Sequence, residues 1–168
     1  NIFNHLSDKL IATMKKDEHL IISFDGENSQ FIRFNNASIR QTGLVDDATM
    51  GLKYIANGRT CYGAYTVSGN QDIDIQRGEN EIDRMRKESE EIPADPFLVM
   101  PKNSGSSHEI KKVNGLPFDN AVSALIPIME GIDFVGIWVN GKMYRGNANS
   151  AGQRHWFETD SHCLDYSL

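Results

Sequence analysis

The densest group of residues that could do chemistry lies near the C-terminal end of the sequence. His155, His162 and Cys163 have Asp160 and Asp165 close by in the chain, and zinc prefers imidazole, thiolate and carboxylate ligands. The spacing matches no compact zinc signature, and neighbouring residues of a strand point to opposite faces. We therefore expect polar strand residues and one buried cysteine here. A small enzyme using His155, His162 and Cys163 is the weaker alternative.

Other catalytic motifs are incomplete in this sequence. His108-Glu109 resembles the start of a zinc-protease helix, but no second histidine follows one turn later, so we expect a solvated loop histidine. No nucleophile elbow of the Gly-x-Ser-x-Gly type and no phosphate-binding glycine loop is present. The carboxylates of residues 79–91 alternate with basic side chains, which is typical of a solvated helix face. The residues themselves therefore indicate no catalytic group and no metal ligand.

Three consecutive residues are candidates for binding. Arg154, His155 and Trp156 form the stretch richest in polar and aromatic side chains, shortly after Asn149-Ser150-Ala151-Gly152. Because tryptophan and arginine are overrepresented at binding hot spots, these three residues are weak candidates for contacting a peptide or a protein partner. A hairpin with a half-buried tryptophan is the alternative, and it fits the same residues better.

Length, charge and cysteine content exclude several classes of protein. The 168 residues suffice for one domain or two small ones, and 17 basic against 23 acidic residues give a net charge of −6, which argues against direct nucleic-acid binding. No apolar run approaches the length of a membrane-spanning helix. Two cysteines are too few for a disulfide scaffold and fit a reducing cytoplasm. We expect a cytoplasmic protein without a membrane or nucleic-acid partner.

The two ends of the sequence predict a fragment of a longer protein. The first residue is Asn1 rather than methionine, and residues 164–168 have the composition of the middle of a strand.

Hydrophobic periodicity predicts three helices. Apolar residues recur at spacings of three and four over residues 2–16. Helices are also expected over residues 71–91, which carry Ile75, Ile82 and Met85, and over residues 118–129. Asn70 is a suitable N-cap for the second helix, and Pro127 is expected to kink or end the third.

The segments between these helices have the alternating pattern of short strands. Asn57-Gly58 and Asn140-Gly141 predict two-residue hairpin turns because both residue types tolerate positive φ, and Asp25-Gly26 is a third turn signal. Residues 101–108 have the composition of a mobile linker. Strands are expected at 20–24, 31–34, 38–41, 50–54, 59–68, 97–100, 135–139, 143–145, 154–159 and 163–167.

Tight turns rather than crossover helices join strands that are neighbours in sequence, and this connection favours antiparallel pairing. The predicted fold class is therefore α+β, with antiparallel β-sheet meanders and three flanking helices. We expect an N-terminal helix, sheet and helix domain over residues 1–100. Residues 101–168 begin a second region of a helix and hairpins, which is expected to be truncated.

Three segments resemble one known protein family. Residues 27–39, read as ENSQFIRFNNASI, and the later Asn57-Gly58-Arg59-Thr60 resemble the opening strand pairs of TldD/PmbA proteins. Asn149-Ser150-x-Gly152 resembles a later turn of the family, and its placement after a helix and a hairpin also fits the family. The resemblance covers nearly the whole chain, in order.

This resemblance implies the N-terminal portion of a TldD/PmbA-like metalloprotease, a group once described as modulators of DNA gyrase. Such proteins are cytosolic dimers, formed with themselves or with a paralogous subunit, and they process unfolded peptides. The zinc site of the family lies in its C-terminal half, and none of its ligands has a match here, so no catalytic residue is transferred. The implied role is a scaffold, dimerisation and peptide-binding portion whose exposed strand edges accept an extended peptide. The alternative from another class is a stand-alone α+β interaction module that binds a protein through the strands of Trp138 and Trp156.

Overall fold

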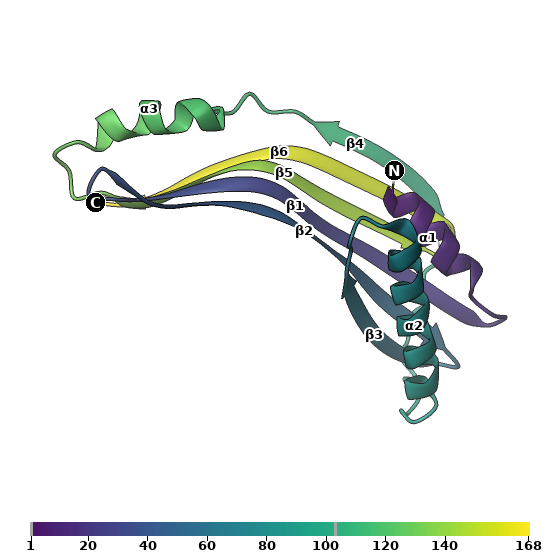
Figure 1. Ribbon diagram of the computed structural model, residues 1–168. Coiled ribbons are helices and arrows are strands. Elements are labelled where there is room, and N and C mark those ends of the chain that lie inside the picture. The colour runs from purple at the N-terminus through teal and green to yellow at the C-terminus, as the bar shows by residue number, and fades with distance from the viewer. Residues whose placement is uncertain (1, 103) are drawn as a thin grey trace. The chain divides into compact units, whose positions relative to one another are not determined.

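The computed structural model describes residues 2–102 and 104–168. In these residues the chain forms three helices and one six-stranded, mostly antiparallel sheet with the strand order β3-β2-β1-β5-β6-β4 (Figure 1). The predicted α+β class with three helices is confirmed. The elements are α1 (Ile2–Ala12), β1 (Glu18–Asn35), β2 (Ser38–Ala56), β3 (Arg59–Thr66), α2 (Gln71–Ser89), β4 (Gly105–Lys111), α3 (Phe118–Met129), β5 (Val135–Asn149) and β6 (Gln153–Ser167).

The chain divides into two compact units that interleave along the sequence. Unit 1 comprises Asn1–Asp25, Ala48–Glu109 and Arg145–Phe157, and unit 2 comprises Gly26–Asp47, Ile110–Tyr144 and Glu158–Leu168. The strands β1, β2, β5 and β6 each contribute residues to both units. The expected boundary between residues 100 and 101 falls inside the second segment of unit 1. The division into a domain of residues 1–100 and a second region of residues 101–168 stays a prediction.

The core of unit 1 is built around the apolar face of α1. Phe3, Leu6 and Leu10 lie one turn apart and are fully buried. The Phe3 ring lies 5.7 Å from that of Phe24 in β1 and 5.8 Å from that of Trp156 in β6. These contacts pack α1 against the strands of unit 1. The helix ends at Ala12, four residues before the expected end.

The second helix begins as the sequence predicts. The Asn70 side chain accepts hydrogen bonds from the backbone N–H groups of Asp72 and Ile73, which confirms its role as N-cap. Gly78 lies inside α2, where glycine lowers helix propensity. A Cβ at this position would lie 2.7 Å from a Leu10 methyl group. The glycine therefore permits the close approach of α1 and α2.

A partly buried ion pair joins the end of α1, the start of β1 and α2. The Arg86 guanidinium donates to both carboxylate oxygens of Glu18, at 2.8 Å for the shortest contact, and to the Thr13 carbonyl at 2.7 Å. Burial by itself would raise the pKa of Glu18. Hydrogen bonds from Arg86, the Lys15 N–H and Tyr54, and the positive charge of Arg86, have the opposite effect and are stronger. Together they lower the pKa of Glu18 to about 2. The ionised carboxylate is therefore the form that the folded chain stabilises.

One hairpin turn is confirmed and two expected turns are wrong. Asn57 and Gly58 both have positive φ, 51° and 71°, and connect Ala56 to its register partner Arg59. By contrast, β1 continues through Asp25-Gly26 and β5 continues through Asn140-Gly141. A Cβ at Gly141 would collide with the backbone of Asn28 and Ser29. This glycine therefore serves the close approach of β5 to β1 and forms no turn.

Several other expectations of local structure are also wrong. The strands predicted at 38–41 and 50–54 belong to the single strand β2, and residues 97–100 form no strand. Residues 105–108 of the expected linker belong to β4, so His108 is an exposed strand residue rather than a loop residue. Cys163 is exposed and Cys61 is the buried thiol. Residue 103 of the linker lies outside the described residues.

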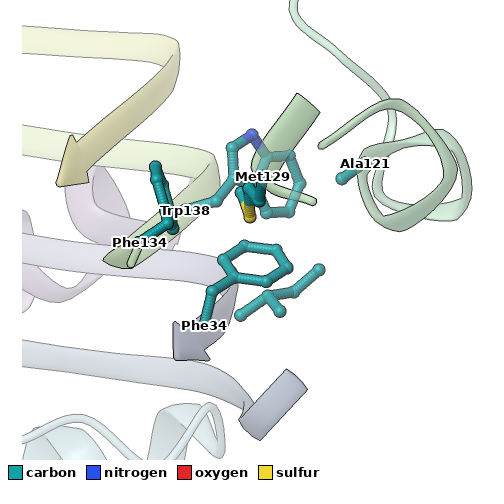
Figure 2. Close-up of a cluster of buried hydrophobic side chains, with 6 residues drawn as sticks. Phe34, Ala121, Met129, Phe134 and Trp138 are labelled. Carbon is teal, nitrogen blue, oxygen red and sulfur yellow. The ribbon is translucent and has the colours of Figure 1, made fainter. Parts of the chain in front are cut away.

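Unit 2 has a separate apolar core under α3. Figure 2 shows Phe34 of β1, Trp138 of β5 and Phe134 gathered with Ala121 and Met129 of α3. The rings of Phe34 and Phe134 meet edge to face, with centroids 6.4 Å apart. Pro127 lies inside α3, which ends at Met129. No helix in the described part of the chain has the length and apolar character needed to cross a bilayer.

Replacement of Glu18 by Gln tests the ion pair. Because the folded-state pKa of Glu18 lies below its ordinary value of 4.5, the pair stabilises the fold above pH 4.5, and this stabilisation is lost as the pH falls toward 2. We expect E18Q to lower the free energy of unfolding by on the order of 2–3 kcal/mol at pH 7, and much less near pH 2. Urea unfolding at several pH values measures both. An equal loss at pH 7 and pH 2 would contradict the assignment; the exposed Glu79→Gln is the control.

Candidate functional site

The outer edge of β2 is left open because β3 is the shorter strand. β3 pairs with Thr49–Ala56, and the Val67 N–H donates to the Ala48 carbonyl at 2.8 Å. The part of β2 in unit 2, Ser38–Asp47, lies beyond this pairing and has β1 on its other side. In the described ranges no backbone hydrogen bond to a loop or turn reaches this edge. A strand edge of this kind presents N–H and C=O groups that another chain can pair with.

The pairing pattern shows which residues point outward. The Ala48 carbonyl points to the β3 side, and backbone groups of alternate residues in a strand point to the same edge. Leu44 and Asp46 therefore direct their N–H and C=O groups outward. The Leu44 side chain is 79% exposed, and Arg40 and Asp47 near the two ends of the segment are exposed as well. The edge thus carries a positive charge near one end and negative charges at the other.

An open groove of about 510 Å³ in unit 2 shares Arg40 with this strand. Its lining comes from the end of β1, from Arg40 of β2, from the start of β5 and from the end of β6. The rings of Tyr166 and Phe134 stack at 5.4 Å beside it. A Cβ at Gly136 would lie 2.9 Å from the Asp165 carbonyl oxygen, so glycine permits the close packing of β5 and β6 here.

Two arginines supply the positive charge of this groove. Arg33 and Arg40 both line it and both are exposed. The Arg33 guanidinium lies 5.7 Å from the centre of the Phe31 ring, a cation–π contact. Among residues 2–102 and 104–168, no carboxylate lies within ion-pair distance of either guanidinium. Both groups therefore keep their hydrogen-bonding capacity for a ligand.

The three residues expected to bind a peptide have structural contacts in unit 1. Arg154 donates to Asp8 at 2.8 Å and to the carbonyls of Asn149 and Gln153. Trp156 is buried against aromatic rings of α1 and β1. His155 Nδ1 lies 2.9 Å from the Ser107 hydroxyl, which links β6 to β4. A peptide-binding role for Arg154, His155 and Trp156 stays a prediction.

His162 and Cys163, two members of the weaker alternative site, lie on the surface of unit 2. His162 and Cys163 are both exposed, and the His162 ring lies beside Gly115 in unit 2. No group of three or more His, Cys, Asp and Glu side chains in the described part of the chain could hold a metal ion.

A fully buried carboxylate holds the loop before α2. Asp74 accepts hydrogen bonds from the Ser68 N–H and hydroxyl, both at 2.8 Å, and from the Gly69 N–H at 3.1 Å. Burial, and then the Asp74 charge, raise the pKa of Tyr65 above its ordinary value. These hydrogen bonds account for the buried carboxylate without a catalytic role.

The Asn149-Ser150-x-Gly152 motif forms the turn between β5 and β6. The Asn149 carbonyl oxygen Oδ1 accepts from the Ala151 N–H at 2.9 Å and from the Gln153 N–H at 3.1 Å, while its side chain is buried. Ser150 pairs with the start of β1: its hydroxyl accepts from the Leu20 N–H at 2.9 Å. Gly152 has a φ of 99°, which favours glycine. The structure therefore explains why asparagine, serine and glycine occur at these three positions of the turn.

Sequence reasoning missed Arg33 and Arg40, although a signal was present. Asn36 and Ala37, with φ of 48° and 54°, form the turn between β1 and β2. Arg33 lies three residues before this turn and Arg40 three residues after it. A two-residue turn assigned at this position would have placed the two arginines together.

Replacement of Asn149 by Ala tests the turn. The loss of Oδ1 leaves the N–H groups of Ala151 and Gln153 without their acceptor, and we expect the free energy of unfolding to fall by about 1–3 kcal/mol. Asn149→Asp keeps an oxygen acceptor at the same place and should cost less. Chemical denaturation measures both variants. An Asn149→Ala variant as stable as the wild type would show that the turn does not need these hydrogen bonds.

No model of a known protein family matches the sequence, and no curated protein matches it either. Solved structures do match. A protein described as a candidate modulator of a DNA gyrase from Thermotoga maritima superposes with a TM-score of 0.67 at 16% identity, over 96% of this chain and 38% of that one. TldE from Thermococcus kodakarensis superposes with a TM-score of 0.68 at 11% identity, over 99% of this chain and 42% of that one. A protein described as a candidate modulator of DNA gyrase from Bacteroides thetaiotaomicron superposes with a TM-score of 0.54 at 13% identity, over 98% of this chain and 38% of that one.

These likenesses concern the fold, since all three identities are low. This chain spans well under half the length of each of the three proteins. The sequence resemblance implies the N-terminal portion of a TldD/PmbA protein. A portion of this kind would also cover less than half of the whole protein. The chain therefore has the fold of a region, 38–42% of the whole, that is found in TldE and in proteins described as gyrase modulators.

Proposed function

We propose that this chain is the scaffold and peptide-binding portion of a larger TldD/PmbA-like metalloprotease that acts on unfolded peptides. Two observations support the family: the fold likeness to TldE, and the sequence resemblance over residues 27–39, 57–60 and 149–152. The chain would be catalytically incomplete by itself, with zinc held by the C-terminal half of the parent if that parent is the active subunit. A second copy or a paralogous subunit would be its partner, in the cytoplasm.

The observation that carries the peptide-binding role is the open edge of β2 at Ser38–Asp47. An unfolded peptide offers a free backbone, and an added strand binds mainly through backbone hydrogen bonds with little dependence on sequence. This mode of binding suits a protease that acts on unstructured chains. A folded protein would be excluded because its backbone groups are already paired.

The alternative interaction module receives less support from the structure. Trp138 and Trp156, the residues proposed to contact a partner, are 3% and 9% exposed. Each indole packs in an apolar core, Trp138 with α3 and Trp156 with α1. A partner that bound along these strands would have to use other side chains.

A proline at Leu44 tests peptide addition to β2. Leu44→Pro removes an outward N–H without touching the pairing with β1, a position where an edge strand tolerates proline. Leu44→Ala is the matched control, because it removes the exposed side chain and keeps the N–H. We expect Leu44→Pro to weaken the binding of an unstructured peptide about tenfold, and Leu44→Ala about twofold at most. Fluorescence anisotropy with a labelled peptide measures the affinities, and circular dichroism checks the fold.

A second peptide tests whether binding depends on hydrogen bonds from the peptide backbone. The same sequence with N-methyl groups at alternate residues cannot donate hydrogen bonds along one side. We expect it to bind much more weakly than the unmethylated peptide. Equal affinity for the two peptides, or for the two Leu44 variants, would rule out strand addition at this edge.

A further inference from the structure

We propose that the groove between Arg33 and Arg40 binds a carboxylate of the incoming peptide, so that the chain selects acidic peptides. This inference rests on the proposed function for the peptide itself, but the groove and its charges are independent observations. It names a class of substrate that an open strand edge alone does not specify.

The charges of the groove favour an anion. Arg33 and Arg40 line it from adjacent strands, and in the described residues neither has a carboxylate partner. Asp165 is the acidic residue of the lining, so the side chains of the groove have a net charge of +1. Two guanidinium groups that line one groove repel each other, and a bound carboxylate would relieve this repulsion. The overall charge of −6 makes such a local positive site distinctive.

The chemistry of arginine favours a carboxylate as the ligand. A guanidinium is planar and offers parallel N–H donors that match the two oxygens of a carboxylate. The groove volume of about 510 Å³ accommodates an acidic side chain or the end of a peptide. The Phe31 ring under the Arg33 guanidinium restricts the positions of that side chain, which reduces the entropy lost on binding.

The position of Arg40 links the groove to the strand edge. Arg40 lies in β2, four residues before Leu44, whose N–H points outward. At about 3.3 Å per residue, a peptide residue next to Arg40 lies roughly 13 Å from one next to Leu44. Asp46 and Asp47 at the other end of the edge would repel an acidic residue. The edge should therefore prefer peptides with acidic residues at one end.

The test compares peptides that differ only in charge. One unstructured peptide has two glutamates at one end, and its partner has glutamine at both positions. Each is made with a free and with an amidated C-terminus, because an α-carboxylate offers the same chemistry. We expect the wild-type protein to bind the glutamate peptide about tenfold more tightly than the glutamine peptide. A preference that follows the free C-terminus instead would identify the α-carboxylate as the ligand.

Variants of the two arginines test whether the groove causes the preference for the glutamate peptide. Arg33→Gln with Arg40→Gln should abolish the preference and leave the affinity for the neutral, amidated peptide unchanged. The matched control is Lys9→Gln with Lys112→Gln, two exposed positive charges outside the groove, which should retain the preference. No preference in the wild type, or a preference that survives loss of both arginines, would overturn the inference.

A separate measurement distinguishes failure of the groove from failure of the strand edge. Succinate, a dicarboxylate without a peptide backbone, is titrated while the Nε–H signals of Arg33 and Arg40 are followed by NMR. Saturable shifts of both signals, unchanged in Leu44→Pro, would support the groove even if no peptide binds the edge. Peptide binding without any such shift would support the edge and overturn the carboxylate site.

Discussion

The unequal lengths of β2 and β3 are the constraint on which the candidate site depends. β3 ends at Thr66, so it pairs with the C-terminal part of β2 alone. The chain then enters α2, whose N-terminus is held by Asn70 and by the buried Asp74. The chain leaves the sheet after Thr66 and begins α2 at Gln71, so β3 does not extend along the rest of β2. The remaining backbone of β2 in unit 2 therefore stays open on one side, where water or another chain must satisfy its polar groups.

The interiors of the two units account for the stability of this arrangement. Unit 1 buries the aromatic group of Phe3, Phe24 and Trp156, and unit 2 buries Phe34 and Trp138 under α3. Apolar burial of this kind stabilises each unit without help from the open edge. The Glu18–Arg86 pair adds a directional contact, and removal of either partner would leave a partly buried charge unpaired. The edge and the groove can thus remain exposed without loss of the fold.

The two Asn-Gly pairs show where local signals succeed and fail. Asn57-Gly58 forms a turn because the segments on both sides pair with each other. Asn140-Gly141 has the same chemistry, but β5 pairs with β1, and Gly141 lies against the backbone of Asn28 and Ser29. Glycine serves close approach in one case and positive φ in the other. Turn propensity is local, whereas the choice of strand partner depends on contacts far away in the sequence.

The sequence by itself determined the helices, the Asn70 cap, the Asn57-Gly58 hairpin and the α+β class, since these depend on periodicity and on residues near one another. It also contained the Asn149-Ser150-x-Gly152 turn, whose hydrogen bonds are formed within a few residues and to Leu20. Tertiary structure alone decided that β1, β2 and β5 are long unbroken strands and that Arg154 and Trp156 have partners in α1. It also decided that the start of β5 and the end of β6 complete one groove with Arg33 and Arg40. The physical reason is that strand pairing and burial join residues distant in the chain, and no local pattern records which distant residues will meet.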